Sequence, residues 1–563
     1  MNILLILPLS YPYDEIVFQV DSMEWERKIS NIKGIKKPDI AYPNGLLSIA
    51  AYIKKHYPNV DIRILDFNML ICKVVEDSNR DIFSMRKEEF WGYCLSLIPD
   101  FKADIIGISL MFCSVFEDLI PLVGFLRKRF DNIFIAVGGH LATAIYDTIL
   151  QNLRGAVDAV CYGEGEIPFL ELVYAISEGR AKEYLESDNS WVTCGKLLNH
   201  VNFTPQNKFI YELDDIPMYD FDVIVERKLY LKYIKALMFS EDREADSTFY
   251  MFTTRGCPGR CVFCASQNVH GHNVRYYSTQ RVKSDIMHYM STYGIKSVMF
   301  YDDHFLTDRC RAIEILDFMS ENKIKTNVAN PPFFSISEEV AASLKRAGIK
   351  ETILAIESGN EETLRNIVHK PGNLDRARES IDYLRHEGIV VFCNLLLGFP
   401  GETKEAMEKS IEGALGLGSN WYSCYVVAPL PGSELYEICK KNNNFVPGSD
   451  IFKMNFKKGV IQTQDFTHEY VEKKVYETNL LLNFVKNHDM KIGNFALALR
   501  LFERVLDDVI DTHAFAYYFS AICAMNLGLN EKYKRYKGRY YEMIGKFNYW
   551  REWSEYFKLD DLP

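Results

Sequence analysis

The 563-residue chain lacks the long apolar segments and the basic tracts that would tie it to a membrane or to nucleic acid. Its longest apolar run, "IVVFCNLLLGF" at 389–399, is far shorter than the roughly 20 residues that a membrane-spanning helix needs. The net charge is −11 and no dense cluster of Lys and Arg is present. This charge balance argues against nucleic acid or an anionic membrane as the main partner. We therefore expect no membrane span and no nucleic-acid partner.

The amino terminus also lacks the features of a secretory signal. The stretch "MNILLILP" has a short apolar core, no preceding Lys or Arg, and an early proline, a pattern more typical of a buried strand. We predict a cytoplasmic location.

A disulfide framework is absent as well. Of the thirteen cysteines, ten are scattered singly through apolar segments such as "LMFCSVF" and "DAVCYG". Such isolated cysteines in a long chain are typical of reduced core residues. The other three lie close together in the chain.

The length exceeds what one hydrophobic core can serve, so we expect about three or four domains. Short β-branched runs alternate with helical patterns over residues 2–170, which predicts an α/β domain with a doubly wound parallel sheet. The alternation stops and then resumes as six strand–helix units, which predict a partial or full parallel barrel. The carboxyl-terminal part has mostly helical periodicity. The predicted divisions are 1–180 for the first domain, 181–245 for a linker, 246–444 for the barrel and 445–563 for a helical region.

Small and polar residues in the first domain gather where predicted strands end. Ligands of doubly wound sheets bind at the carboxyl ends of the strands. The GxGxxG fingerprint of dinucleotide-binding domains is absent after the first strand, where "LPLSYPY" stands instead. The residues at the predicted strand ends are Ser109, Gly138, Gly139, His140, Gly163, Glu164 and Gly165.

The segment "TTRGCPGRCVFCASQN" at 253–268 places Cys257, Cys261 and Cys264 in a CxxxCxxC spacing. A zinc ribbon would need a second CxxC or a Cys/His pair, and a ferredoxin would need a fourth nearby cysteine. Neither is completed, because Cys310 is isolated and the histidines of "NVHGHN" have no second pair. Three thiolates leave one iron of a cubane cluster with an open position, which favours a reactive site over a structural one.

This spacing, with Phe263 just before the last cysteine and on the loop after the first barrel strand, resembles the radical S-adenosylmethionine (SAM) enzymes. The resemblance implies that Cys257, Cys261 and Cys264 hold a four-iron four-sulfur (4Fe-4S) cluster. It also implies that the amino and carboxylate groups of SAM chelate the fourth iron.

Further segments of the barrel resemble the same family in the same order. They are "FYDDHF", "AIESGNEETL", "GFPGET" and "PLPGSELYE". The commoner Gly-Gly-Glu of the family is absent at the first of them, where an Asp pair stands. The resemblance implies SAM contacts from Phe263, Asp302, Asp303, Glu357, Ser358, Asn394 and Gly398.

With a radical SAM barrel downstream, the elements "GISLM", "VGGH" and "YGEGE" resemble the cobalamin-binding domain of cobalamin-dependent radical SAM enzymes. The glycines would let the backbone approach the nucleotide tail and the corrin edge. The resemblance implies cobalamin contacts from Ser109, Leu110, Met111, Gly138, Gly139, His140, Gly163, Glu164 and Gly165. The Asp-x-His-x-x-Gly loop that carries a cobalt ligand in many such domains is absent, and the first histidine is His56. We expect cobalamin to bind with its own base displaced and without a histidine ligand, which leaves the lower face of cobalt to a non-coordinating residue or water from the 9–13 loop or near Met111.

The resemblance implies an enzyme that uses a 4Fe-4S cluster, SAM and cobalamin, and most members methylate their substrates. We predict a methyltransferase that acts on an unactivated carbon through a 5'-deoxyadenosyl radical and methylcobalamin. The alternative is a cyclisation or rearrangement without methyl transfer, and a third hypothesis is a non-catalytic cobalamin or iron–sulfur sensor. The expected partners are a small-molecule, lipid or peptide substrate and a one-electron donor such as flavodoxin or ferredoxin.

Overall fold

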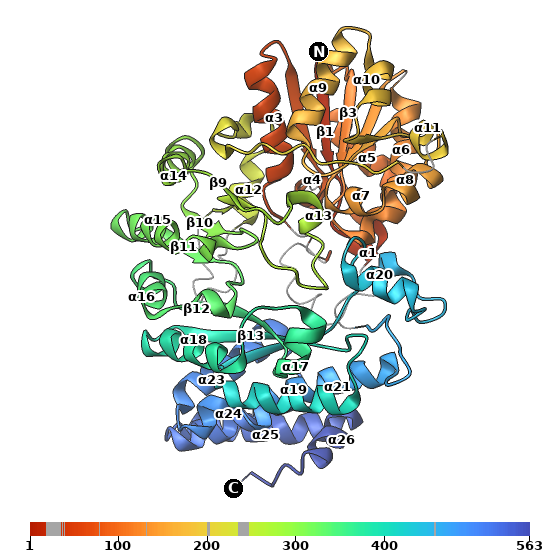
Figure 1. Ribbon diagram of the computed structural model, residues 1–563. Helices are drawn as coiled ribbons and strands as arrows, with labels where there is room; N and C mark the ends of the chain where they lie inside the picture. The colour runs from red at the N-terminus through yellow and green to blue at the C-terminus, as the bar shows by residue number, and fades with distance from the viewer. Residues whose placement is uncertain are drawn as a thin grey trace.

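The computed structural model describes residues 1–18, 35, 36, 38, 40–77, 79–130, 132–199, 203–234, 247–454 and 458–562. The amino-terminal α/β domain, the barrel and the carboxyl-terminal helices follow one another along the molecule, with the two termini at opposite ends (Figure 1). None of the helices in these ranges combines the length and the apolar character needed to cross a membrane.

The first domain is a six-stranded sheet in the order β2-β1-β3-β4-β5-β6. Neighbouring strands run parallel except for β5 and β6. Ile3 and Leu5 of the first strand pack into one core cluster and Leu4 and Ile6 into another, because successive side chains of a strand point to opposite faces. This doubly wound arrangement confirms the prediction. The strands are β1 (Asn2–Leu7), β2 (Asp61–Asp66), β3 (Ile105–Ser109), β4 (Phe134–Gly138), β5 (Ala159–Cys161) and β6 (Trp191–Val192).

Helices cover both faces of this sheet. α3 (Asn44–His56) and α9 (Glu166–Ser177) contribute to the core on one face. On the other face lie α4 (Phe67–Glu76), α5 (Lys87–Ser96), α6 (Phe116–Arg129) and α8 (Tyr146–Asn152). Two short helices, α1 (Tyr13–Phe18) and α7 (His140–Ala144), follow the carboxyl ends of β1 and β4.

The range 181–245, expected to be a linker, is partly built into the first domain. After α10 (Ala181–Ser187), β6 pairs with β5 as the sixth strand, so the sheet extends beyond residue 180. Farther along, α12 (Lys228–Tyr233) places the Tyr230 ring on Tyr42, with ring centroids 4.5 Å apart. The segment therefore packs against the domain that it leaves.

The second domain is a partial (β/α)6 barrel made of two three-stranded parallel sheets, β11-β10-β7 and β12-β13-β14. A single bridge between Pro332 and Ala355 joins them. The strands are β7 (Thr248–Met251), β10 (Ser297–Phe300), β11 (Lys325–Val328), β12 (Glu351–Glu357), β13 (Val390–Leu397) and β14 (Trp421–Val426). The helices between them are α14 (Thr279–Tyr293), α15 (Arg309–Glu321), α16 (Glu338–Arg346), α18 (Leu374–His386) and α19 (Lys404–Leu417), and α20 (Glu434–Lys441) follows β14.

Side-chain amides cap both outer strands of this incomplete barrel. On β7, the carbonyl of Tyr250 accepts a hydrogen bond from Asn44 Nδ2 of the first domain at 2.9 Å. On β14, Asn483 accepts from the amide of Tyr422 at 2.7 Å and donates to its carbonyl at 2.8 Å. Neighbouring parts of the chain thus satisfy edge groups that would otherwise invite pairing with another strand.

The carboxyl-terminal region is helical, as predicted, and covers the amino-terminal ends of barrel strands. Arg504 lies 2.9 Å from Glu351 at the start of β12. Trp421, the first residue of β14, contacts the rings of Phe484 and Phe502. The region comprises α21 (His468–Leu480), α22 (His488–Lys491), α23 (Phe495–Arg504), α24 (Ala514–Asn526), α25 (Asn530–Lys546) and α26 (Asn548–Tyr556).

Candidate active site

A small hairpin holds the base of the cysteine loop. β8 (Thr254–Arg255) pairs antiparallel with β9 (Arg275–Tyr276), so the intervening residues form a closed loop after β7. Gly256 has a φ of +91°, and a Cβ there would lie 2.5 Å from the carbonyl oxygen of Asn273. The next amide, of Cys257, donates to the carbonyl of Gly271 at 3.3 Å. Glycine is therefore required where the two sides of the loop meet.

The three cysteines share one turn of this loop. A Cβ built on Gly259 would lie 3.4 Å from Cys257 Sγ and 3.9 Å from Cys261 Sγ, so these two sulfurs flank the same glycine. Cys264 follows through a hydrogen bond from its amide to the carbonyl of Cys261 at 3.0 Å. All three side chains are half-buried thiols.

The chemistry of this donor set fits an iron–sulfur cluster. Burial, and to a lesser extent the charge of Asp303, raises the pKa of Cys264 to about 11. Thiolates at this position therefore need adjacent positive charge, which the irons of a cluster supply. In the described part of the chain, no three His, Cys, Asp or Glu side chains lie close enough together to hold one metal ion. A cubane holds its cysteines farther apart than a single ion does, because each sulfur binds a different iron.

A buried ion pair lies beside the cysteines and joins Glu357, a predicted SAM contact, to Lys370, which the sequence analysis missed. Lys370 Nζ is 2.9 Å from Glu357 Oε1, and both side chains are less than a tenth exposed. Burial raises the pKa of the Cys257 and Cys261 thiols, and the Lys370 charge partly offsets this rise. Glu357 has a φ of +73° at a bulge in β12, a strained conformation of the kind found at functional sites.

No local motif marks Lys370 in the sequence. Its position results from the π-helical turn of residues 364–368, followed by His369 with a φ of +60°. These features return the chain to Glu357, thirteen residues earlier. Only the folded turn shows that the lysine belongs to the site.

The two aspartates predicted to bind SAM have different surroundings. Asp302 is buried and accepts hydrogen bonds from the amides and hydroxyls of Thr253 and Thr254, the hydroxyl distances being 3.0 and 2.9 Å. Burial raises its pKa to about 6, against the effect of Arg311. Asp302 therefore fixes the chain just before the cysteine loop. Asp303 is exposed. Its negative charge acts to raise the pKa values of Cys257, Cys264 and His140.

Ser358, a predicted SAM contact, is not accessible at the site. Its side chain is fully buried, and its hydroxyl lies 2.9 Å from the hydroxyl of Ser410 in α19 and accepts from the amide of Asn360. It thus packs the strand end against a barrel helix.

The other predicted SAM contacts lie on β13, on the turn after it and on the cysteine loop. Asn394 is half-buried on the face of β13 opposite Cys393. Gly398 has a φ of +95° and donates its amide to Glu402, which holds the turn. The ring of Phe263 lies 6.3 Å from that of Phe399. The turn and the cysteine loop are therefore neighbours.

The carboxyl edge of the first domain carries an apolar surface suited to a large flat cofactor. Met111 and Phe112, directly after β3, are 45% and 43% exposed. Ser109, Gly138 and His140, at the ends of β3 and β4, are half-buried. Exposed apolar groups beside polar strand ends are typical of a ligand site, and these residues fit cobalamin.

Gly139, by contrast, is needed for contact within the protein. It has a φ of +98°, and a Cβ there would lie 2.6 Å from the carbonyl oxygen of Leu110. The Leu110 side chain is fully buried and its amide donates to the carbonyl of Gly138. Leu110 and Gly139 therefore join the ends of β3 and β4, and the Leu110 side chain is not available to a ligand.

Gly163 and Gly165 also serve internal packing. Gly163 has a φ of +77°, and a Cβ there would fall 1.1 Å from Asn207 Oδ1. A Cβ added at Gly165 would lie 2.7 Å from Ile49 Cδ1. Protein side chains thus occupy the space beside these two glycines, which were predicted to let cobalamin approach the backbone.

The Glu164 side chain reaches the hairpin of the barrel. Its carboxylate contacts Arg275 at 2.9 Å, Arg255 at 3.1 Å and His270 at 2.8 Å, and its side chain is 2% exposed. Although burial opposes it, the two guanidinium groups hold the pKa of Glu164 well below its usual range. The residue connects the two domains, and the structure does not place it on the cobalamin surface.

The predicted cobalamin edge and the cysteine loop meet directly. α7 packs against α13 (Gln267–His270), which follows the last cysteine, and both lie at the boundary between the first domain and the barrel (Figure 1). The rings of His140 and His270 have centroids 5.2 Å apart. Burial and the adjacent His270 lower the pKa of His140 to about 4. His140 is therefore neutral near pH 7.

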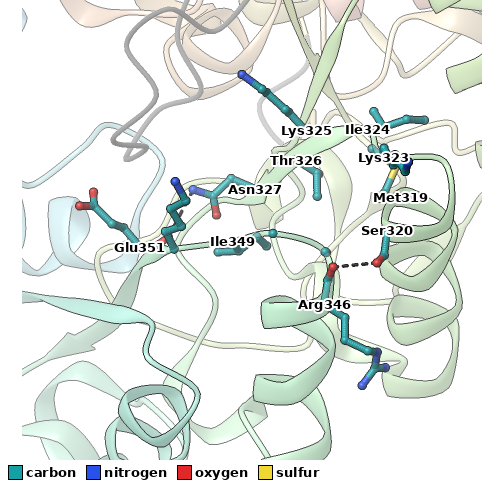
Figure 2. Close-up of a pocket in the computed structure, with 13 residues that line it drawn as sticks. Met319, Ser320, Lys323, Ile324, Lys325, Thr326, Asn327, Arg346, Ile349 and Glu351 are labelled. Atoms are coloured by element: carbon teal, nitrogen blue, oxygen red, sulfur yellow. Dashed lines mark hydrogen bonds between the residues drawn. The ribbon is translucent and has the colours of Figure 1, made fainter.

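A cavity of about 230 Å³ lies elsewhere, between the beginnings of β11 and β12 (Figure 2). Lysine and arginine side chains at its rim, including Lys323 and Arg346, follow or end α15 and α16, where cations offset the helix dipoles. Sites of parallel barrels lie at the carboxyl ends of the strands. This cavity is at the opposite end, and we assign it no part in the site.

Two family models match the chain. The B12 binding domain matches residues 34–173, and the Radical SAM superfamily matches residues 251–414. Each covers one of the two domains whose facing edges are described above. The chain therefore carries the two domains that together define the cobalamin-dependent radical SAM enzymes, whose cofactors are a 4Fe-4S cluster, SAM and cobalamin.

Individual proteins are similar over most of the chain. An uncharacterized methyltransferase of Pyrococcus horikoshii is 27% identical over 80% of this chain and 88% of its own length. Cytidylyl-2-hydroxyethylphosphonate methyltransferase of Streptomyces wedmorensis is 25% identical over 75% of this chain and 82% of its own. Among solved structures, the cobalamin-dependent SAM radical enzyme OxsB with aqua-cobalamin bound covers 98% of this chain and 84% of its own, with a TM-score of 0.61 and 12% identity. The TM-score shows a shared fold.

Replacing a predicted cluster ligand should impair binding of the cluster and leave the fold intact. We expect the Cys264→Ala variant to lose at least about half of the iron and sulfide bound after anaerobic reconstitution and to lose SAM cleavage. Iron analysis and deoxyadenosine formation measure the two losses. Cys310→Ala, which removes an exposed thiol, is the control and should match the wild type. A Cys264→Ala protein that still cleaves SAM would contradict the assignment.

Proposed function

We propose that the protein transfers a methyl group to an unactivated carbon of a small-molecule, lipid or peptide substrate. The observation that carries this proposal is the contact between the cobalamin edge and the cysteine loop through His140 and His270. When bound, the cofactors supply a 5'-deoxyadenosyl radical, which abstracts the hydrogen, and a methyl group, which replaces it. Both groups would then act on one substrate held between the domains.

The charged groups beside the cysteines suit the zwitterionic methionyl end of SAM. Lys370, buried against Glu357, would bind the carboxylate, and Asp303 offers an acceptor to the amino group. A buried and pre-formed ion pair loses little entropy when it binds its ligand. These residues position the sulfonium relative to the cluster.

The chain must also protect a radical from water. The carboxyl-terminal helices cover the beginnings of β12 and β14 through Arg504 and Trp421. The first domain packs on the other side, against the loop that carries the cysteines. Reaction chemistry would thus take place between protein layers.

The names of the relatives support methylation over ring formation, because both curated relatives described above are methyltransferases. A one-electron donor such as flavodoxin or ferredoxin would reduce the cluster. All thirteen cysteines are free thiols, which is typical of a reducing compartment; we infer a cytoplasmic location.

Product analysis tests methyl transfer. With substrate, SAM, cobalamin and a reductant, we expect a product heavier by one methylene unit, together with S-adenosylhomocysteine and deoxyadenosine. Mass spectrometry with methyl-deuterated SAM should show three deuterons in the product. Deoxyadenosine formed with an unmethylated, rearranged or cyclised product would support the alternative activity instead. No deoxyadenosine at all would support a sensor.

The role of Lys370 can be separated from that of the cluster. We expect Lys370→Met to weaken SAM binding by about 10- to 100-fold, because removing one partner of a buried charge pair is costly. Iron content should not change. Lys345→Met, on the surface of α16, is the matched control. Equilibrium binding of SAM by the reconstituted variants makes the comparison, and unaltered affinity would exclude the proposed contact.

The missing histidine loop predicts the coordination of cobalt. The segment between β1 and α1 contains no histidine, and His56 is exposed at the end of α3. With cobalamin's own base displaced as well, we expect the cob(II)alamin form to have no nitrogen ligand on cobalt. Its paramagnetic resonance spectrum should lack nitrogen splitting on the cobalt lines. A spectrum with such splitting, lost in His140→Ala, would instead identify His140 as a ligand.

A further inference from the structure

We propose that Glu164 is a positioning residue through which the cobalamin-binding domain sets the geometry of the cysteine loop. The residue lies in the first domain, two residues before the start of α9. Its contacts Arg255 and Arg275 are the two residues that pair across the hairpin at the base of that loop. One carboxylate therefore spans both strands of the hairpin from another domain.

Because Arg255 lies close to the first cysteine, its contact with Glu164 affects the position of the cysteine loop. Arg255 stands two residues before Cys257, and its side chain is 10% exposed. Its guanidinium contacts Glu164 and also Glu166 at 2.6 Å, and it donates to Ser48 at 2.9 Å. These acceptors all belong to the first domain, so the start of the cysteine loop is held by groups outside the barrel.

The other side of the loop is held by the same carboxylate. Arg275 begins β9 directly after the loop, and its Nη1 also donates to the carbonyl of Ile210 at 2.9 Å. His270, on α13, contacts Glu164 through Nδ1 and faces His140 through its ring. Movement of Glu164 would therefore displace the entry and exit of the loop together.

Charge balance explains why the contact requires a carboxylate. Arg255 and Arg275 are matched by Glu164 and Glu166, and all four side chains are a tenth or less exposed. A neutral residue at 164 would leave one guanidinium charge buried without a partner, which is costly in a low-dielectric interior. The hairpin would relax to hydrate it, and the loop would move with the hairpin.

The experiment compares hydrogen exchange in full-length protein loaded with cluster and cobalamin. In Glu164→Gln, we expect the amides of residues 256–274 to exchange at least about tenfold faster, since their closure depends on the lost contact. Exchange in the strands of the first sheet should not change. Lys54→Met, which removes an exposed ion pair with Asp220 on the same side of the first domain, is the control and should leave the loop protected.

A second variant keeps the test decisive if Glu164→Gln folds poorly. Glu164→Gln combined with Arg275→Gln leaves Arg255 paired with Glu166 and no unmatched charge, so loop protection should be partly restored. Protection in the single variant equal to the wild type, or a double variant no better than the single, would overturn the proposal.

A spectroscopic readout separates positioning from general stability. The magnetic interaction between the reduced cluster and cob(II)alamin depends on their separation, and it should be weaker or more broadly distributed in Glu164→Gln at unchanged iron and cobalt content. An interaction identical to that of the wild type would contradict a positioning role. Both measurements are independent of the proposed methyl transfer, which could fail without affecting them.

Discussion

The arrangement of the two domains depends on a buried carboxylate between two arginines. Glu164 leaves the carboxyl edge of a doubly wound sheet and ends in a hairpin of the barrel. A carboxylate in such a place is tolerated only because matched guanidinium groups and their hydrogen bonds compensate for the loss of water. The same contact determines where the cysteine loop lies relative to the ends of β3 and β4. This ion network therefore sets the distance between the cysteine loop and the carboxyl edge of the first sheet.

Around this network, glycine performs a different task from the one expected of it. At Gly139 and Gly163 the backbone has positive φ, and the space that a Cβ would take is occupied by Leu110 and Asn207. The glycines allow strand ends and loops of the protein to approach one another. Exposed apolar residues such as Met111 remain at the carboxyl edge of the sheet.

The cysteine loop was predictable because its chemistry is local. Three sulfurs within eight residues, flanked by glycine, must lie near one another in any fold, and the barrel and the sheet follow from alternating strand and helix patterns. Lys370 and the use of Asp302 were not predictable in this way. Adjacent aspartates have the same chemistry, and only the position of Thr253 and Thr254 turns Asp302 inward while Asp303 stays exposed. Likewise, the π-helical turn before Lys370 has no simple sequence signal.

By itself, the sequence determined the order of the domains, the close spacing of three cysteines and the absence of a histidine loop, because each depends on spacing or periodicity along the chain. Only the tertiary structure decided which polar residues stay accessible where the two domains face each other and which hold the domains together. Ser358 and Glu164 carry groups suited to binding a ligand. Both instead bind protein partners that are distant in sequence. The physical reason is that a buried polar group must find a partner, and whether that partner is protein or ligand depends on contacts that form only in the folded chain.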